Sequence, residues 1–305
     1  KHVGTAKNVS VSGITASGAD AGNYSYNTAA ATTANITPKP ITINATGVNK
    51  VYDGGTAATI AALGATGLVA GDVITFDNAS AAFDDKNAGI GKTVTVSGIA
   101  ATGADAGNYS YSATANTTAD ISRLGITVDA TGTNKVYDGT TADVVALASA
   151  GVLSGDVVSF AGTGNFADKH VGTAKVVSVS GIAANGIDAG NYSFNTTAAT
   201  TANITAKPVT INATGVNKVY DGGTAATIAA LGATGLVAGD VITFDNASAA
   251  FDDKNAGIGK TVTVSGIAAT GADAGNYSYS ATANTTADIS RLGITVDATG
   301  TNKVY

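Results

Sequence analysis

Cysteine, methionine, tryptophan, glutamate and glutamine are all absent from this chain of 305 residues. The missing cysteine excludes disulfides, thiol catalysis and thiolate metal sites. Without glutamate, glutamine and methionine, the chain lacks several of the best helix formers, and residues that favour strands and turns, such as Thr, Val, Ile, Asn and Gly, dominate it. These absences predict an all-β protein with many turns.

Positive charge and long apolar runs are also scarce. The chain has 16 lysines and arginines against 22 acidic residues, with a formal net charge of −6 and a pI near 4.7. No basic patch is visible, so we expect no nucleic-acid partner. No apolar stretch reaches the roughly 18 residues that a membrane-spanning helix needs, so the sequence predicts no membrane span in this segment.

The sequence repeats itself about every 84 residues, which is the pattern of a tandem array. Three markers recur in step: the tyrosine of Val-Tyr-Asp-Gly, the tyrosine of Asp-Ala-Gly-Asn-Tyr, and the lysine of Lys-(His/Asn)-(Val/Ala)-Gly. The first marker is Tyr52, Tyr137, Tyr220 and Tyr305. The second is Tyr24, Tyr109, Tyr192 and Tyr277, and the third is Lys1, Lys86, Lys169 and Lys254. Residues 42–137 are identical to residues 210–305, so two types of repeat alternate.

The markers predict five segments. Residues 1–40 are the C-terminal part of a repeat, residues 41–125, 126–208 and 209–293 are full repeats, and residues 294–305 begin a further one. We name the full repeats the first, second and third repeat. The linker at 122–125 is only about four residues long, so neighbouring repeats should have little freedom, and we expect them to stack into an elongated rod.

Alternation of apolar and polar residues predicts most of the strands of the first repeat. They are expected at 41–45, 73–76, 81–83, 92–99 and 109–121, with the next repeat opening on a strand at 126–128. The run 109–121 exceeds the usual strand length, so it should contain a bend or bulge. Residues 105–108 should form a tight hairpin connection. For Ala57–Leu63, both a strand and a short helix remain open.

This pattern predicts a small β domain, either an immunoglobulin-like sandwich or a β-grasp-like fold. Three segments, read in fixed order, carry a further resemblance: ITINATGVNKVYDGGT, GLVAGDVITF and FDDKNAGIGKTVTVSGIAATGADAGNYSY. Together they resemble the YDG repeat of bacterial exoproteins of the filamentous-haemagglutinin type, and the related MBG repeats. The resemblance covers essentially the whole chain. Its motif residues here are Tyr52, Asp53, Gly54, Tyr137, Asp138, Gly139, Tyr220, Asp221, Gly222, Asp105, Gly107, Asn108 and Tyr109.

The resemblance implies a stalk or filament segment of a secreted or cell-surface bacterial adhesin, with adhesion or biofilm as its setting and no catalytic residues. Neighbouring repeats would be its main partners. Two alternatives stay open: a subunit of an extracellular fibre that assembles by edge-strand pairing with other copies, and a repeat module that binds ions or host or surface glycans. No nucleophile–base pair or phosphate loop stands out, so we predict that the chain is not an enzyme.

Three kinds of candidate site follow from the repeated residues. Asp72, Asp84, Asp85 and Asp105 supply hard oxygen ligands for calcium, although aspartates are also ordinary turn residues, and no other cofactor is expected. Lys50, Lys135 and Lys218 are candidates for an isopeptide bond to an asparagine on the last strand. The alternative is a solvent-facing lysine beside Asp53.

Tyr52 and its copies should be core residues whose hydroxyl reaches a nearby backbone carbonyl, or else an exposed row for carbohydrate contact. His2 and His170 occupy one equivalent position in polar turns, where we expect them to be solvated.

Overall fold

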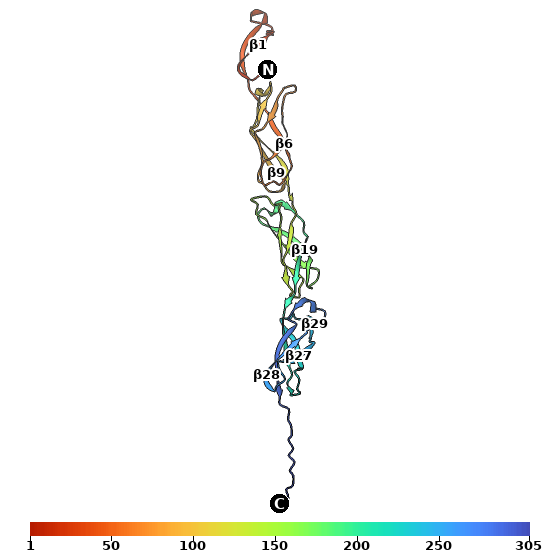
Figure 1. Ribbon diagram of the computed structural model, residues 1–305. Helices are drawn as coiled ribbons and strands as arrows, with labels where there is room; N and C mark the ends of the chain where they lie inside the picture. Colours follow the sequence, from red (N-terminus) through yellow and green to blue (C-terminus); the bar gives the residue numbers. More distant parts are fainter. The chain divides into compact units, whose positions relative to one another are not determined.

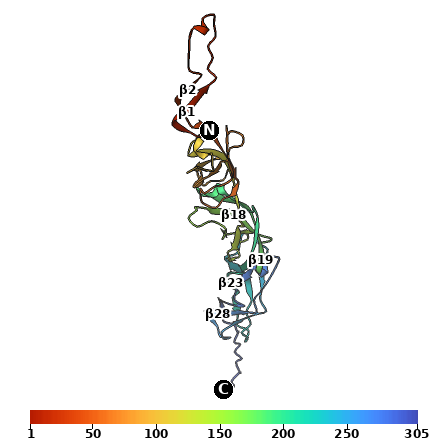
Figure 2. The same cartoon turned by 90° about the horizontal axis from the view of Figure 1, so that it is seen from above.

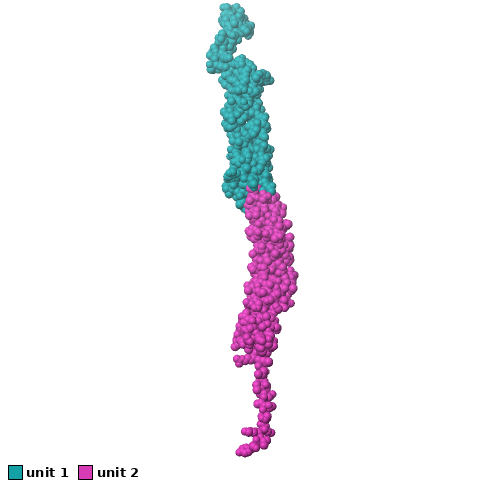
Figure 3. Space-filling model, viewed as in Figure 1, with its two compact units in different colours: residues 1–127, 150–159, 185–194 teal, residues 128–149, 160–184, 195–305 magenta.

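The computed structural model describes residues 1–305 and divides into two compact units. The first unit consists of residues 1–127, 150–159 and 185–194, and the second of residues 128–149, 160–184 and 195–305 (Figure 3). The second repeat is therefore shared between the units. Strands and three-residue 3-10 turns make up the regular structure, without any α-helix, which confirms the all-β prediction. No helix of the chain is long and apolar enough to cross a membrane.

The first repeat is a small sandwich inside the first unit (Figure 1). Its larger sheet has the order β5 (Lys50–Val51), β12 (Thr114–Ser122), β9 (Gly89–Ser97) and β8 (Ser80–Phe83). A second sheet pairs β4 (Thr42–Val48) with β6 (Thr59–Thr66), and a third pairs β7 (Thr75–Asp77) with β10 (Ala100–Thr102). Strand β4 packs against β12, which closes the sandwich.

Period-two patterning explains the core of this sandwich. In β9, Val94 and Val96 are fully buried while Thr95 between them faces outward. Tyr52, Phe83 and Ile121 complete the core from neighbouring segments. The sandwich alternative is therefore the correct one, since a β-grasp fold would need a helix packed on its sheet.

Most predicted strands are present, but the long one is interrupted. Residues 109–121 split into β11 (Tyr109–Ser110), which pairs with β3 (Lys39–Pro40), and β12, with a further register shift between Ala119 and Ile121. The predicted bend is thus confirmed. Ala57–Leu63 contributes to strand β6 rather than to a helix.

The predicted tight hairpin at 105–108 is wrong, because this segment lies within a longer connection between the antiparallel strands β9 and β12. The segment is a 3-10 turn, η2 (Ala106–Asn108), whose flanking strands do not pair with each other, because β10 pairs with β7 and β11 with β3. The predicted strand at 126–128 is also wrong. The backbone N–H of Val128 donates to the Asn195 side chain at 2.8 Å, and strand β14 begins only at Asp129. Instead, part of the linker forms β13 (Leu124–Gly125), which pairs with β20 (Tyr192–Ser193) of the second repeat.

The second unit repeats the same architecture. In the second repeat, β14 (Asp129–Gly132) pairs with β17 (Val145–Ala148), beside a sheet of order β15-β21-β19-β18-β16. The bounds in that sheet are β15 (Lys135–Val136), β21 (Ala198–Thr205), β19 (Gly172–Asn185), β18 (Ser159–Phe166) and β16 (Ala142–Asp143).

In the third repeat, β23 (Thr210–Gly215) pairs with β25 (Ile228–Thr234), beside a sheet of order β24-β31-β28-β27. This order matches β5-β12-β9-β8 of the first repeat. The bounds in that sheet are β24 (Lys218–Val219), β31 (Thr282–Ser290), β28 (Gly257–Ser265) and β27 (Ser248–Phe251). The third repeat also contains β26 (Thr243–Asp245), β29 (Ala268–Thr270) and β30 (Tyr277–Ser278), while β22 (Lys207–Pro208) ends the second repeat.

The N-terminal segment is a hairpin of the same kind as the β9–β12 pair. Strand β1 (Gly4–Ser12) pairs antiparallel with β2 (Ala29–Ile36), and η1 (Ala21–Asn23) lies between them (Figure 2). Residues 291–305 form no strand or helix.

Candidate functional site

A lysine held between two buried aspartates joins the first repeat to the second within the first unit. The Nζ atom of Lys86 lies 2.7 Å from Oδ1 of Asp156 and 2.8 Å from Oδ1 of Asp188. The two aspartate side chains are only 4% and 8% exposed, while that of Lys86 is 35% exposed. The lysine comes from the first repeat and both carboxylates come from the second, so we call this cluster the first joint.

Two tyrosines complete the first joint. The hydroxyl of Tyr52 donates to Oδ2 of Asp156 at 2.7 Å, and the hydroxyl of Tyr192 donates to the same oxygen at 2.6 Å. Their rings meet edge to face with centroids 5.6 Å apart, a favourable geometry for aromatic pairs. Each polar atom of the Asp156 carboxylate therefore has a partner, as a buried charge requires.

Local backbone structure fixes the second carboxylate. Asp188 precedes η3 (Ala189–Asn191), and its Oδ2 accepts the backbone N–H of Val157 at 2.9 Å. The turn requires Gly186, which has φ 122°, and a Cβ there would lie 2.1 Å from the Val157 carbonyl oxygen. In the same loop, Oδ1 of Asn191 accepts the backbone N–H of Ala88 at 2.8 Å, which adds a further bond between the repeats.

The charges of the joint reinforce one another. Hydrogen bonds to Asp156 and then Asp188 hold the pKa of Lys86 above its ordinary value. Burial works against ionisation of Asp156, but hydrogen bonds from Lys86, Tyr192 and Tyr52 outweigh it and lower the pKa of that carboxyl. Burial, followed by the hydrogen bond to Asp156, raises the pKa of Tyr192 to about 12. The cluster therefore holds one ammonium ion, two carboxylates and two neutral phenols at neutral pH.

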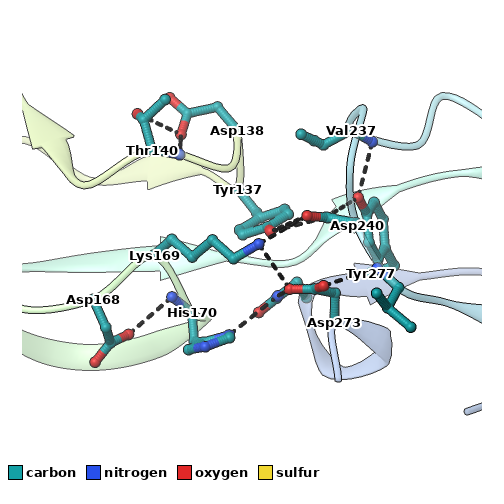
Figure 4. Close-up of polar contacts among 12 residues, drawn as sticks. Tyr137, Asp138, Thr140, Asp168, Lys169, His170, Val237, Asp240, Asp273 and Tyr277 are labelled. Carbon is teal, nitrogen blue, oxygen red and sulfur yellow. Dashed lines mark hydrogen bonds and ion pairs between the residues drawn. The ribbon is translucent and has the colours of Figure 1, made fainter. Parts of the chain in front are cut away.

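The second unit contains the same cluster between the second and third repeats (Figure 4). Nζ of Lys169 lies 2.8 Å from Oδ1 of Asp240 and 2.8 Å from Oδ1 of Asp273. Tyr137 and Tyr277 both donate their hydroxyls to Oδ2 of Asp240, and their rings meet edge to face at 5.6 Å. We call this cluster the second joint. Its agreement with the first joint shows that both repeat types meet their successor in the same way.

A partial version lies at the start of the first unit. Nζ of Lys1 lies 2.7 Å from Asp72 and 3.1 Å from Asp105, and the hydroxyl of Tyr109 donates to Asp72 at 2.6 Å. The backbone N–H of Val3 donates to Asn108 at 3.1 Å.

The four aspartates predicted as calcium ligands lie in two separate places. Asp72 and Asp105 face Lys1, whereas Asp84 and Asp85 lie 3.1 and 2.8 Å from the Nζ atom of Lys92. No group of three or more His, Cys, Asp or Glu side chains is placed to hold a metal ion. Instead, each pair of carboxylates is placed to bind an ammonium group.

The predicted isopeptide lysines occupy a different environment. Nζ of Lys50 lies 2.7 Å from Oδ1 of Asp53 and donates to the Gly55 carbonyl at 2.8 Å, above the ring of Phe83. Lys135 and Lys218 make the same ion pair with Asp138 and Asp221, each at 2.9 Å. Their Nζ atoms thus contact the Tyr-Asp-Gly turn rather than an asparagine of the last strand. The lysine is mostly covered, not solvent-facing, since its side chain is 17% exposed.

Tyr52 and Tyr137 are buried, with 2% and 1% of their surface exposed, which agrees with the predicted core role. The predicted partner is wrong, because each hydroxyl binds a carboxylate of the next repeat instead of a backbone carbonyl. Tyr220, in the third copy of the motif, is only half-buried. Packing of the following repeat therefore accounts for the deep burial of the tyrosine.

The two histidines lie at the edge of these clusters. His170 is exposed, and its Nδ1 lies 3.3 Å from the side-chain nitrogen of Asn276. His2 makes the equivalent contact with Asn108 at 3.4 Å.

The central residues of the joints were missed by sequence reasoning. Lys86 and Lys169 were noticed only as repeat markers, while Asp156, Asp188, Asp240 and Asp273 received no role. One signal could have found them. A lysine and two aspartates recur in every repeat at the same spacing, although no role within a single repeat explains them.

Comparison with known proteins yields one family. The model of the YDG domain matches residues 37–118, 123–201 and 205–287. No curated protein matches the chain.

Among solved structures, the chain aligns with Drosophila N-cadherin EC1-4 at 10% identity and a TM-score of 0.23, over 85% of this chain and 76% of that one. It aligns with Sidekick-1 immunoglobulin domains 1-5 at 11% identity and a TM-score of 0.28, over 82% and 58%. The I9-I11 tandem from titin aligns at 9% identity and a TM-score of 0.22, over 83% and 100%. At such TM-scores, none of these likenesses bears on function.

Proposed function

The chain belongs to the YDG domain family, in three tandem copies, and from this premise we propose that it is a stiff spacer in the stalk of a secreted or cell-surface bacterial adhesin. Its function would be to set a distance from the cell, because each added repeat lengthens the stalk. Quasi-one-dimensional arrays of this kind depend on the contacts between neighbouring repeats.

The observation that supports this proposal most strongly is the recurrence of the joint. A flexible linker would leave neighbouring repeats without specific contacts, whereas each joint here combines ion pairs, tyrosine hydroxyls and a parallel strand pair. In the second unit, β22 pairs with β30 as β13 pairs with β20, so the backbone connection recurs together with the side chains. Stiffness at every joint is what a spacer needs.

Small-angle scattering of the whole chain tests the proposal. A compact globule of this length would have a radius of gyration of about 19 Å. We expect a clearly larger value and a distance distribution with the long tail of an extended particle. A radius near the globular value would contradict the spacer.

A pair of variants tests whether the joints supply the stiffness. Replacing Lys86 and Lys169 with serine should broaden the distance distribution, because the two buried carboxylates of each joint lose their cation. The matched control replaces Lys92 and Lys260, whose ion pairs lie within a single repeat. If both pairs of substitutions change the scattering equally, the joints are not the source of stiffness.

A further inference from the structure

We propose that Lys86 and Asp156, and likewise Lys169 and Asp240, condense into isopeptide bonds that link neighbouring repeats covalently. In each joint a lysine Nζ lies within 2.8 Å of an oxygen of a nearly buried carboxylate that belongs to the next repeat. The bond would lock the joint on which the proposed spacer depends. The bond itself is measured by mass and the spacer by scattering, so either can fail without the other.

The carboxylate to be attacked already carries the groups that would stabilise its reaction. Both tyrosine hydroxyls of the first joint donate to Oδ2 of Asp156, at 2.7 and 2.6 Å. When an amine adds to Cγ, negative charge develops on that oxygen, and preorganised donors aimed at it lower the barrier. Tyr52 and Tyr192 are therefore placed as an oxyanion hole, which gives the recurring tyrosine of Val-Tyr-Asp-Gly a chemical role.

The second carboxylate is placed to move protons. Oδ1 of Asp188 lies 2.8 Å from Nζ of Lys86, while its Oδ2 is held by the backbone N–H of Val157. A carboxylate within hydrogen-bond reach of the attacking nitrogen can accept its proton and return it to the leaving group. Asp273 occupies the same position beside Lys169, at 2.8 Å.

The step is balanced and needs no further reagent. Asp188 takes a proton from the Lys86 ammonium, and the neutral nitrogen attacks Cγ of Asp156 to form the C–N bond. Asp188 passes that proton and a second one from the nitrogen to Oδ1 of Asp156, and the C–Oδ1 bond breaks to release water. The three protons of the ammonium end as one on the amide and two on the water, and nothing is oxidised or reduced.

Proximity lowers the barrier to a reaction that is slow in solution. Groups held in the reacting geometry reach effective molarities of about 10⁵ M or more. The low exposure of Asp156 and Asp188 also keeps away the water that would reverse the reaction. Because the ammonium form predominates in the joint, we expect condensation to be slow, and its rate should change little across neutral pH since the proton moves only inside the cluster.

Another lysine serves as an internal comparison. Lys50 faces one carboxylate, that of Asp53, which is 58% exposed and has no tyrosine hydroxyl bound to it. This site lacks the full set of groups, so it should form no bond.

Intact-mass spectrometry of the whole chain in denaturant tests the proposal. We expect the mass to fall short of the sequence mass by two water molecules, one for each joint. Lys86→Arg should restore one water and the double variant with Lys169→Arg should restore both. Peptide mapping should place the link between Lys86 and Asp156. Tyr52→Phe, with its fold verified by circular dichroism, should slow condensation in the first joint only.

Several results would overturn the inference. A chain with the full sequence mass after prolonged incubation at neutral pH excludes the bond. Water loss that persists in the double arginine variant places the dehydration elsewhere. A link mapped to Asp188 or to Lys50 refutes the assigned roles of the two carboxylates and of the tyrosines.

Discussion

The first and second joints make the same central contacts but differ at their edges. In the first joint, Oδ1 of Asn87 accepts a hydrogen bond from the Asn191 side chain at 3.2 Å. In the second, His170 takes the place of Asn87 and its Nδ1 lies 3.3 Å from the Asn276 side chain. The lysine, both aspartates and both tyrosines stay unchanged. The two joints thus differ at a single side-chain contact at the edge and agree where a buried charge is paired.

Of the changes considered, alkaline titration should have the largest effect on stability, and it should destabilise both joints equally. Burial, followed by the hydrogen bond to aspartate, raises the pKa of Tyr192 and of Tyr277 to about 12. Since the folded state holds these protons more tightly than the unfolded chain does, their contribution to stability is complete below about pH 10 and is lost as pH rises toward 12. Absorbance of ionised tyrosine, followed against pH, should show these two ionising last. If these two tyrosines ionise together with the others, the joints are not closed.

Removal of one tyrosine should destabilise one joint and leave the other unchanged. Tyr52→Ala deletes a buried ring and two interactions of the first joint, and we expect a loss of about 3–5 kcal/mol in the local free energy of opening. Hydrogen exchange should show faster exchange around Asp156 and unchanged exchange around Asp240.

The control for this variant is Tyr220→Ala, which removes a half-buried copy of the same residue and should cost clearly less. Equal losses for the two tyrosines would mean that contact with the next repeat contributes little.

A backbone change should have the next largest effect. Gly186→Ala would put a Cβ 2.1 Å from the Val157 carbonyl oxygen at φ 122°, so the loop that carries Asp188 must shift. We expect a loss of about 1–3 kcal/mol, confined to the first joint. Gly190→Ala, in the same loop, has no atom within 4 Å of the new Cβ. Thermal unfolding of the two variants should therefore differ, and equal midpoints would contradict the steric argument.

The smallest effect is expected from His170→Asn, which converts the edge of the second joint into that of the first. The contact is exposed, so we expect a change of less than about 0.5 kcal/mol. Hydrogen exchange around Asn276 should then resemble exchange around Asn191. A large loss would show that the imidazole has a role beyond the hydrogen bond that an asparagine can replace.

Local signals predicted the strands well and long-range partners poorly. Alternation correctly marked the buried Val94 and Val96, because period-two patterning is a property of the segment itself. The tight hairpin predicted at 105–108 is wrong, because the strands directly beside it pair with β7 and β3 instead of with each other. Asp72 and Asp105 were recognised as functional candidates, but their pairing with a lysine could not be predicted, since that lysine lies in the preceding repeat.

The sequence by itself determined the all-β class, the repeat of about 84 residues, the family and the absence of thiol chemistry, because each of these depends on composition or on spacing along the chain. Only the tertiary structure decided which side chains meet at the joints. Lys86 and Asp156 are 70 residues apart, and Tyr52 and Asp156 are 104 apart. No local pattern joins residues at such separations, and folding of one repeat against the next brings them within hydrogen-bond distance.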